Sequence, residues 1–339
     1  MRNNKDLCLL CLKAEANVRG SHLVPAAFVQ SMIGKRNYED GHVIQPGDDR
    51  ALRSFQGRAN LNNTDPEIRQ NEFVADYILC GGCEKRFGVF ESLVIPLLNQ
   101  KLKDAKQAGN FPIINHSEIF DTILCNQVEP CTLSIFLFGI AWRMSVLYWL
   151  RTGDSTFLSA KRHEFLRRNL DIVMDYLPGR VDKLSEFPPL PYLLVTCRTI
   201  TNCTNNVVLS HPNYLDPYCF WMNEFLFVFS FDIGSLSLLK HISEIDGFIN
   251  DGGGINQSYG PPVILDLAHA VWDRSTRQIL LQASGNLKGI CSERLSRKFG
   301  ISIIEADSRI YSRAIEIERI KDQGFGLCYE QAFKELYSE

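Results

Sequence analysis

The chain has 339 residues, of which 45% are hydrophobic and 22% are charged, and its net charge is −3 with a pI of about 6.2. This composition is ordinary for a globular protein and leaves little room for extended disorder. The slightly negative charge excludes the overall positive field of a non-specific nucleic-acid coat, so any contact with nucleic acid must be local. The length allows one large domain, but we expect a small metal-stapled module joined to a larger domain.

Residues 2–6 are charged or polar and precede no apolar signal segment, so we expect a cytoplasmic, reducing location. The chain has eleven cysteines, an odd number that argues against a secreted disulfide framework. Only four of them fall in CxxC pairs, and we interpret the other seven as small buried hydrophobic residues.

The two CxxC pairs, Cys8 with Cys11 and Cys80 with Cys83, lie about seventy residues apart. Each short loop can turn two thiolates toward one ion, and four thiolates at about 2.3 Å form a closed tetrahedral zinc site. We therefore predict that these four cysteines bind one structural Zn²⁺.

Between the two pairs, residues 21–25 are predicted to be extended, and Pro25 opens a predicted helix through Ile33. Residues 34–69 are polar and rich in glycine, asparagine and aspartate, which predicts a long irregular insert. Its six scattered cations either contact phosphate or belong to a solvated mobile loop. Residues 73–79 have strand character, and residues 84–102 predict a helix that contains Pro96.

A polar stretch at 104–115 marks a predicted domain boundary, and residues 117–151 predict a buried helix. Within them, Leu133–Leu150 is apolar enough to suggest a membrane span, but Arg143 lies in its middle. A central arginine costs about 2.5–3.5 kcal/mol on insertion scales, so we predict a core helix and no membrane association. Arg143 then needs a carboxylate or carbonyl partner, which predicts a buried ion pair.

Residues 154–176 predict an amphipathic helix, whose basic cluster is either a nucleic-acid footprint or a solvated face. Further on, residues 192–201 and 206–210 are strand candidates, and the aromatic run Phe220–Ile233 gives the strongest strand prediction. A polar helix is predicted at 292–299 and a charged helical region from residue 307. The basic cluster consists of Lys161, Arg162, Arg167 and Arg168.

The order CxxC, then SHxxP, then LCxxCE resembles the HNH endonuclease family, whose core is a ββα-metal, treble-clef unit. The resemblance covers about residues 5–95, and the runs 21–28, 78–91 and 141–143 are similar to bacterial proteins of uncertain function with such a module. It implies an α+β fold with a treble-clef zinc module at 1–104 that contains the insert 34–69. A larger mixed α/β domain at 117–339, helical and then β-rich, has no chemical signature that we can name.

In HNH enzymes the histidine before x-x-P is the general base that activates water against a phosphodiester, so the resemblance gives this role to His22. A Mg²⁺ or Mn²⁺ ion would offset charge on the phosphate. The chain departs from the family at Ser21, often a metal-binding histidine or aspartate, and at Glu84, usually histidine. A further histidine four residues later is replaced by Gly88.

Glu84 and Glu91 are seven residues apart, which places both carboxylates on one helical face about two turns apart. Together with Asp76 they offer hard oxygen ligands that favour Mg²⁺ or Mn²⁺ over zinc. The candidate catalytic residues are therefore His22, Glu84 and Glu91.

The resemblance implies a metal-dependent endonuclease that hydrolyses phosphodiester bonds, in DNA rather than RNA. Because such modules serve as toxic effectors, a role in bacterial defence against phage is one candidate context. The alternative is a catalytically inactive, zinc-stapled adaptor that recognises nucleic acid or a partner protein. The sequence leaves open a partner protein and a homo-oligomer.

Overall fold

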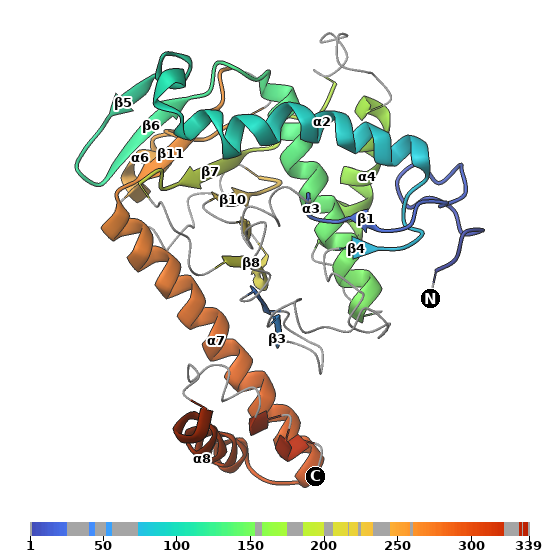
Figure 1. Ribbon diagram of the computed structural model, residues 1–339, viewed down its shortest axis with the longest axis vertical. Helices are drawn as coiled ribbons and strands as arrows, with labels where there is room; N and C mark the ends of the chain where they lie inside the picture. The colour runs from blue at the N-terminus through green and yellow to red at the C-terminus, as the bar shows by residue number, and fades with distance from the viewer. Residues whose placement is uncertain are drawn as a thin grey trace.

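A mixed β-sheet with helices on both faces forms the body of the protein in this computed structural model (Figure 1). The fold combines helices and strands, as predicted. The predicted helix after Pro25 lies outside the described part of the chain. The structure describes residues 2–25, 41–44, 52–55, 74–152, 158–174, 186–199, 206–215, 217–222, 225–232, 245–257, 260–321, 332–333 and 335–337.

Within the described residues, this sheet has nine strands. In order across the sheet they are β3 (Leu52–Phe55), β2 (Gly41–Ile44), β8 (Asn206–Leu215), β9 (Tyr218–Met222), β10 (Phe225–Phe229), β7 (Tyr192–Thr196), β11 (Val263–Leu267), β6 (Phe120–Leu124) and β5 (Ile113–Asn115). Neighbouring strands are antiparallel except for β2 with β8 and β7 with β11, which are parallel. The insert 34–69, which we expected to be irregular, therefore contributes two strands to the sheet.

The aromatic run that we predicted as one strand over 220–233 belongs to two antiparallel strands, β9 and β10. They pair with Phe225 opposite Met222 and Phe229 opposite Tyr218. The overlooked signal is the polar pair Asn223-Glu224, which interrupts the run in the sequence. Hydrophobic density identified the strands but could not by itself place the turn between them.

Helix α3 (Pro130–Thr152) packs on one face of the sheet, where the Phe138 ring lies 5.3 Å from that of Phe229. Helix α2 (Gly81–Asn99) crosses α3, and α4 (Ala160–Met174) packs beside it (Figure 1). The segment Pro130–Leu150 is long and apolar enough to cross a membrane, but 89% of its most apolar window is buried inside this fold. The predicted core helix is confirmed, although β6 replaces helix at the start of the predicted range.

The opposite face of the sheet is covered by α6 (Asp246–Asn250) and by the beginning of α7 (His269–Phe299). We predicted a helix only over 292–299, whereas α7 is a single helix of 31 residues that extends away from the sheet (Figure 1). At its far end α8 (Ile303–Lys321) packs on it with a small core of its own. Two short 3-10 helices, η2 (Lys101–Lys103) and η3 (Ala105–Asn110), follow α2.

One hydrophobic core runs from the two cysteine loops through α2 and α3 to the sheet. It includes Leu10 and Leu23 near the N-terminus, Phe87 in α2, Trp142 in α3 and Phe227 in β10. Residues on both sides of the predicted boundary between 1–104 and 117–339 thus belong to one core, and the two predicted domains are packed together.

Candidate metal centre and the adjoining carboxylate site

The two cysteine loops are joined by backbone hydrogen bonds before any metal is considered. Leu9 N–H donates to Ile78 O at 2.8 Å, and Val18 N–H donates to Leu79 O at 3.2 Å. Between the loops, β1 (Ser21–His22) pairs antiparallel with β4 (Val74–Ala75). Helix α2 then begins directly after Cys80, which places the second cysteine pair at a helix N-terminus.

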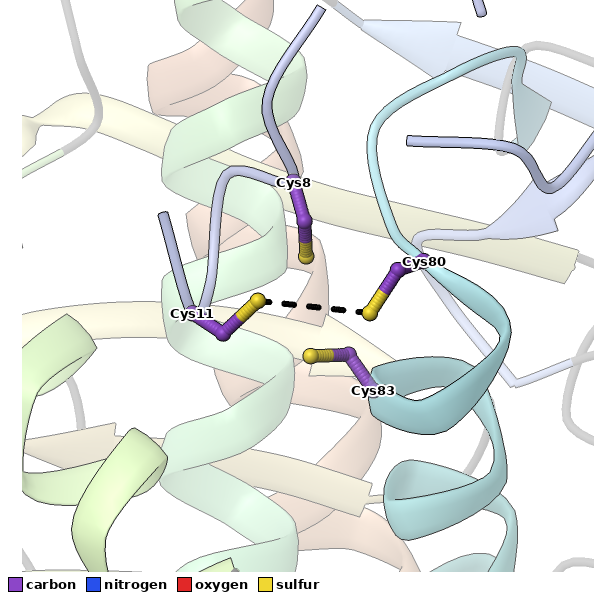
Figure 2. Close-up of side chains that lie close together, drawn as sticks. All are labelled: Cys8, Cys11, Cys80 and Cys83. Atoms are coloured by element: carbon purple, nitrogen blue, oxygen red, sulfur yellow. Dashed lines mark hydrogen bonds between the residues drawn. The ribbon is translucent and has the colours of Figure 1, made fainter. Parts of the chain in front are cut away.

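The structure brings Cys8, Cys11, Cys80 and Cys83 together, with their sulfur atoms within 4.8 Å of one another (Figure 2). The Cys11 and Cys80 sulfurs are 4.0 Å apart, and Figure 2 marks this contact. Four sulfurs at about 2.3 Å from a tetrahedral ion lie about 3.8 Å from each other, so the observed spacing fits. These four thiols can hold one metal ion such as Zn²⁺, as predicted.

The electrostatics of the cluster favour thiolates only in part. The pKa of Cys8 is lowered to about 4 because its sulfur takes part in a hydrogen bond with Cys83. The same bond, together with burial, raises the pKa of Cys83, and burial raises that of Cys80. A bound cation would remove this competition for protons, since metal binding requires and stabilises the thiolate form.

Arg86 brings a positive charge to the cluster. Its Nη2 donates to Cys83 Sγ at 2.8 Å and to Asp171 Oδ1 at 3.1 Å, and its Nη1 donates to Asp171 O at 3.0 Å. The N-terminus of α2 adds partial positive charge on the same side. The two together offset part of the negative charge that four thiolates would concentrate there.

Two members of the predicted basic cluster on α4 have partners within the protein. Arg167 Nη1 donates to Leu10 O at 2.5 Å and thereby holds the first cysteine loop, while Arg162 Nη1 donates to Tyr218 Oη at 2.8 Å. Lys161 and Arg168 are exposed. The interpretation as a nucleic-acid footprint therefore depends on these two side chains alone.

A second group of polar side chains gathers around Glu84 in the first turn of α2. Ser21 is fully buried and its hydroxyl lies near the Glu84 carboxylate, but among the described residues neither Ser21 Oγ nor Glu84 Oε2 makes a hydrogen bond of good geometry. Burial raises the pKa of the Glu84 carboxyl, as does nearby Glu91, whereas Ser21, Arg143 and His22 oppose the shift. The charges of the predicted residues His22 and Glu91 thus both act on the Glu84 carboxyl.

Arg143 joins this group from α3, and its predicted buried ion pair is confirmed. Its Nη1 donates to Glu91 Oε1 at 2.6 Å and to His22 O at 3.0 Å, and the guanidinium lies 4.5 Å from the centre of the Phe87 ring. Sequence reasoning did not place Arg143 in the candidate site. The available signal was a single cation in a long apolar helix.

Asp76, the other predicted carboxylate, has a structural contact. Its Oδ1 accepts a hydrogen bond from Gly20 N–H at 2.7 Å, which braces the chain where it enters β1. Asp76, which we considered as a third oxygen ligand, is therefore bonded to the main chain of Gly20.

Comparison of the chain with protein-family models, with curated proteins and with solved structures found no match. Two groups of side chains therefore carry the evidence for function: the four-cysteine cluster and the polar group around Glu84. The tetrathiolate cluster uses all four positions of a tetrahedral ion and leaves none for substrate, which is typical of structural zinc. The neighbouring site combines a partly exposed imidazole, at His22, with a carboxylate that has an unpartnered oxygen, at Glu84.

Proposed function

We propose that the chain is a metal-dependent endonuclease of the HNH type that hydrolyses phosphodiester bonds in DNA. In this proposal Cys8, Cys11, Cys80 and Cys83 hold structural Zn²⁺ in a treble-clef unit made of the first cysteine loop, β1, β4 and α2. The observation that carries the proposal is the buried Glu84 oxygen, which lacks a hydrogen bond of good geometry although the Ser21 hydroxyl and the charge of His22 both act on this carboxyl. A polar atom buried without a partner is expensive, which favours a bound cation as its missing partner.

The proposed mechanism assigns one task to each side chain. The His22 imidazole accepts a proton from the attacking water as the water oxygen bonds to phosphorus. The P–O bond to the leaving oxygen breaks, and that oxygen takes a proton from solvent. Glu84 supplies a hard oxygen ligand, and a Mg²⁺ or Mn²⁺ ion bound there would offset the phosphate charge. Ser21 Oγ can donate to Glu84 or accept from a water on the ion.

The test is cleavage of plasmid DNA by the purified full chain in Mg²⁺, Mn²⁺ or EDTA, with zinc content measured on every sample. We expect cation-dependent nicking that His22→Ala abolishes at unchanged zinc content. His269→Ala is the matched control because His269 is exposed at the start of α7, and it should cleave like the wild type. Cleavage that survives His22→Ala would contradict the assignment of the base.

One observation favours the alternative, a zinc-stapled adaptor that binds nucleic acid or a partner protein. One Glu91 oxygen is engaged by Arg143 and one Asp76 oxygen by Gly20 N–H, so of these predicted acidic candidates only Glu84 has, among the described residues, a buried oxygen without a hydrogen bond of good geometry. An adaptor predicts no cleavage in any cation despite one bound zinc per chain. It also predicts that His22→Ala leaves nucleic-acid binding unchanged, whereas Cys80→Ser abolishes it.

A further inference from the structure

We propose that Arg143 is a positioning residue of the candidate site, which holds the His22 strand against the helix that carries Glu84. This inference rests on the proposed function. Arg143 lies 121 residues after His22 and 52 after Glu91, outside the segment 5–95 that resembles the HNH core but within the similar run 141–143.

The geometry makes one nitrogen of Arg143 a bridge between two elements. Nη1 contacts the main-chain oxygen of His22 in β1 and the carboxylate of Glu91 in α2, at 3.0 Å and 2.6 Å. The His22 carbonyl belongs to the residue that carries the imidazole. Glu84 and Glu91 share one face of α2. By joining the His22 main chain to Glu91, Arg143 therefore also sets the distance between the His22 imidazole and the Glu84 carboxylate.

The surroundings of the guanidinium allow it little movement. The Phe87 ring lies on one side at 4.5 Å and is itself stacked on Trp142 at 6.1 Å. Gly139, one turn before Arg143, leaves just enough room, because a Cβ there would lie 3.1 Å from Phe87 Cε1. Because the Arg143 guanidinium has little freedom to move, it can hold the His22 carbonyl and the Glu91 carboxylate in place.

A merely structural role explains this arrangement less well. Arg143 is almost completely buried in an apolar helix, and replacing a buried ion pair such as Arg143–Glu91 with hydrophobic residues of similar volume is often neutral or stabilising. Apart from a bond from Nε to Gly139 O in its own helix at 3.4 Å, its hydrogen bonds go to the two elements that carry the candidate catalytic residues. It follows that Glu91 serves to hold Arg143, and that Glu84 remains as the carboxylate for the cation.

The test compares Arg143→Gln, Arg143→Lys and Glu91→Gln in the full chain, with Arg198→Gln as control. Arg198, which follows β7, forms an ion pair with Asp266 of β11 at 2.7 Å and is more exposed than Arg143. We expect Arg143→Gln to lower kcat about 100-fold, as misplacement by about 1 Å does, with KM and zinc content unchanged. Arg143→Lys should be intermediate, because it keeps the charge but loses the planar geometry.

Glu91→Gln separates the two roles of Glu91, since its amide oxygen can still accept from Arg143 but binds a hard cation poorly. We expect a loss of no more than about tenfold in kcat, whereas loss of a true metal ligand would resemble the about 100-fold effect of Arg143→Gln. A normal kcat in Arg143→Gln, or a change in KM alone, would overturn the proposal.

Hydrogen exchange distinguishes failure of this inference from failure of the proposed function. In Arg143→Gln we expect amide exchange of residues 18–25 to accelerate about tenfold while the protection of residues 8–16 stays unchanged. If the wild type cleaves no DNA, the endonuclease proposal fails, and this measurement still decides whether Arg143 holds the strand. Unchanged exchange at 18–25 would refute it.

Discussion

Loss of the Glu91 carboxylate should destabilise the fold far more than loss of an exposed partner in a similar ion pair. The Arg143 side chain is 3% exposed and that of Glu91 23% exposed, so Glu91→Ala leaves a charge that water scarcely reaches. Removing one partner of a buried pair costs about 3–5 kcal/mol. Because His22 O and Phe87 still contact the guanidinium, we expect about 3 kcal/mol, the lower end of that range.

The matched control is Glu305→Ala, which breaks the Arg309–Glu305 pair, 2.8 Å long and 50% exposed on both sides. We expect a loss of about 0.5 kcal/mol or less, which decreases further at high salt. Urea unfolding followed by circular dichroism gives both values from midpoints at constant slope. Equal effects of the two substitutions would refute the argument from burial. So would a double variant Arg143→Leu with Glu91→Leu that is less stable than Glu91→Ala.

Three further predictions concern the metal, the partly buried His163 and a helix crossing. Cys80→Ser should abolish zinc binding, measured by atomic absorption, and remove the hydrogen-exchange protection of residues 2–25. The reason is that structural zinc contributes about 10–16 kcal/mol of folding free energy. Full protection of these residues without zinc would contradict this prediction. Burial lowers the pKa of His163 from its ordinary value of 6.5, so the unfolded chain binds its proton first. Stability should be complete above pH 6.5 and decrease as the pH falls through the lowered value, and His163→Gln should flatten this dependence in urea titrations at pH 5–7. Gly139→Ala should destabilise the fold by about 1–2 kcal/mol because Phe87 cannot move aside. Gly88→Ala, whose added Cβ meets nothing within 4 Å, should instead stabilise α2 by about 0.5–1 kcal/mol. If both substitutions changed the stability in the same direction, the contact between residue 139 and Phe87 would not be tight.

The elements predicted well from the sequence are those whose signal is local. The periodic apolar positions of α2 and α4 and the continuous apolar run of α3 identified these helices, because burial of one face or of a whole helix requires such patterns. The pairing of strands was less accessible. Strands β2 and β3 lie in a polar segment and join β8, which follows them by more than 150 residues.

The candidate site divides in the same way. The CxxC spacing by itself indicated the four-cysteine cluster, since two thiols in one short loop already face the same way and only one long closure remains. The spacing of Glu84 and Glu91 likewise placed both on one side of α2. The sequence could not tell which of the two carboxylates would be free to bind a cation.

The sequence by itself therefore determined the four-cysteine cluster, the main helices and the need of Arg143 for a partner. Only the tertiary structure decided that this partner is Glu91 and the carbonyl of His22, and that a Glu84 oxygen stays unpartnered. The physical reason is that these contacts join β1, α2 and α3 across 52 to 121 residues of chain. They depend on how α2 crosses α3 over Gly139, which no local pattern records.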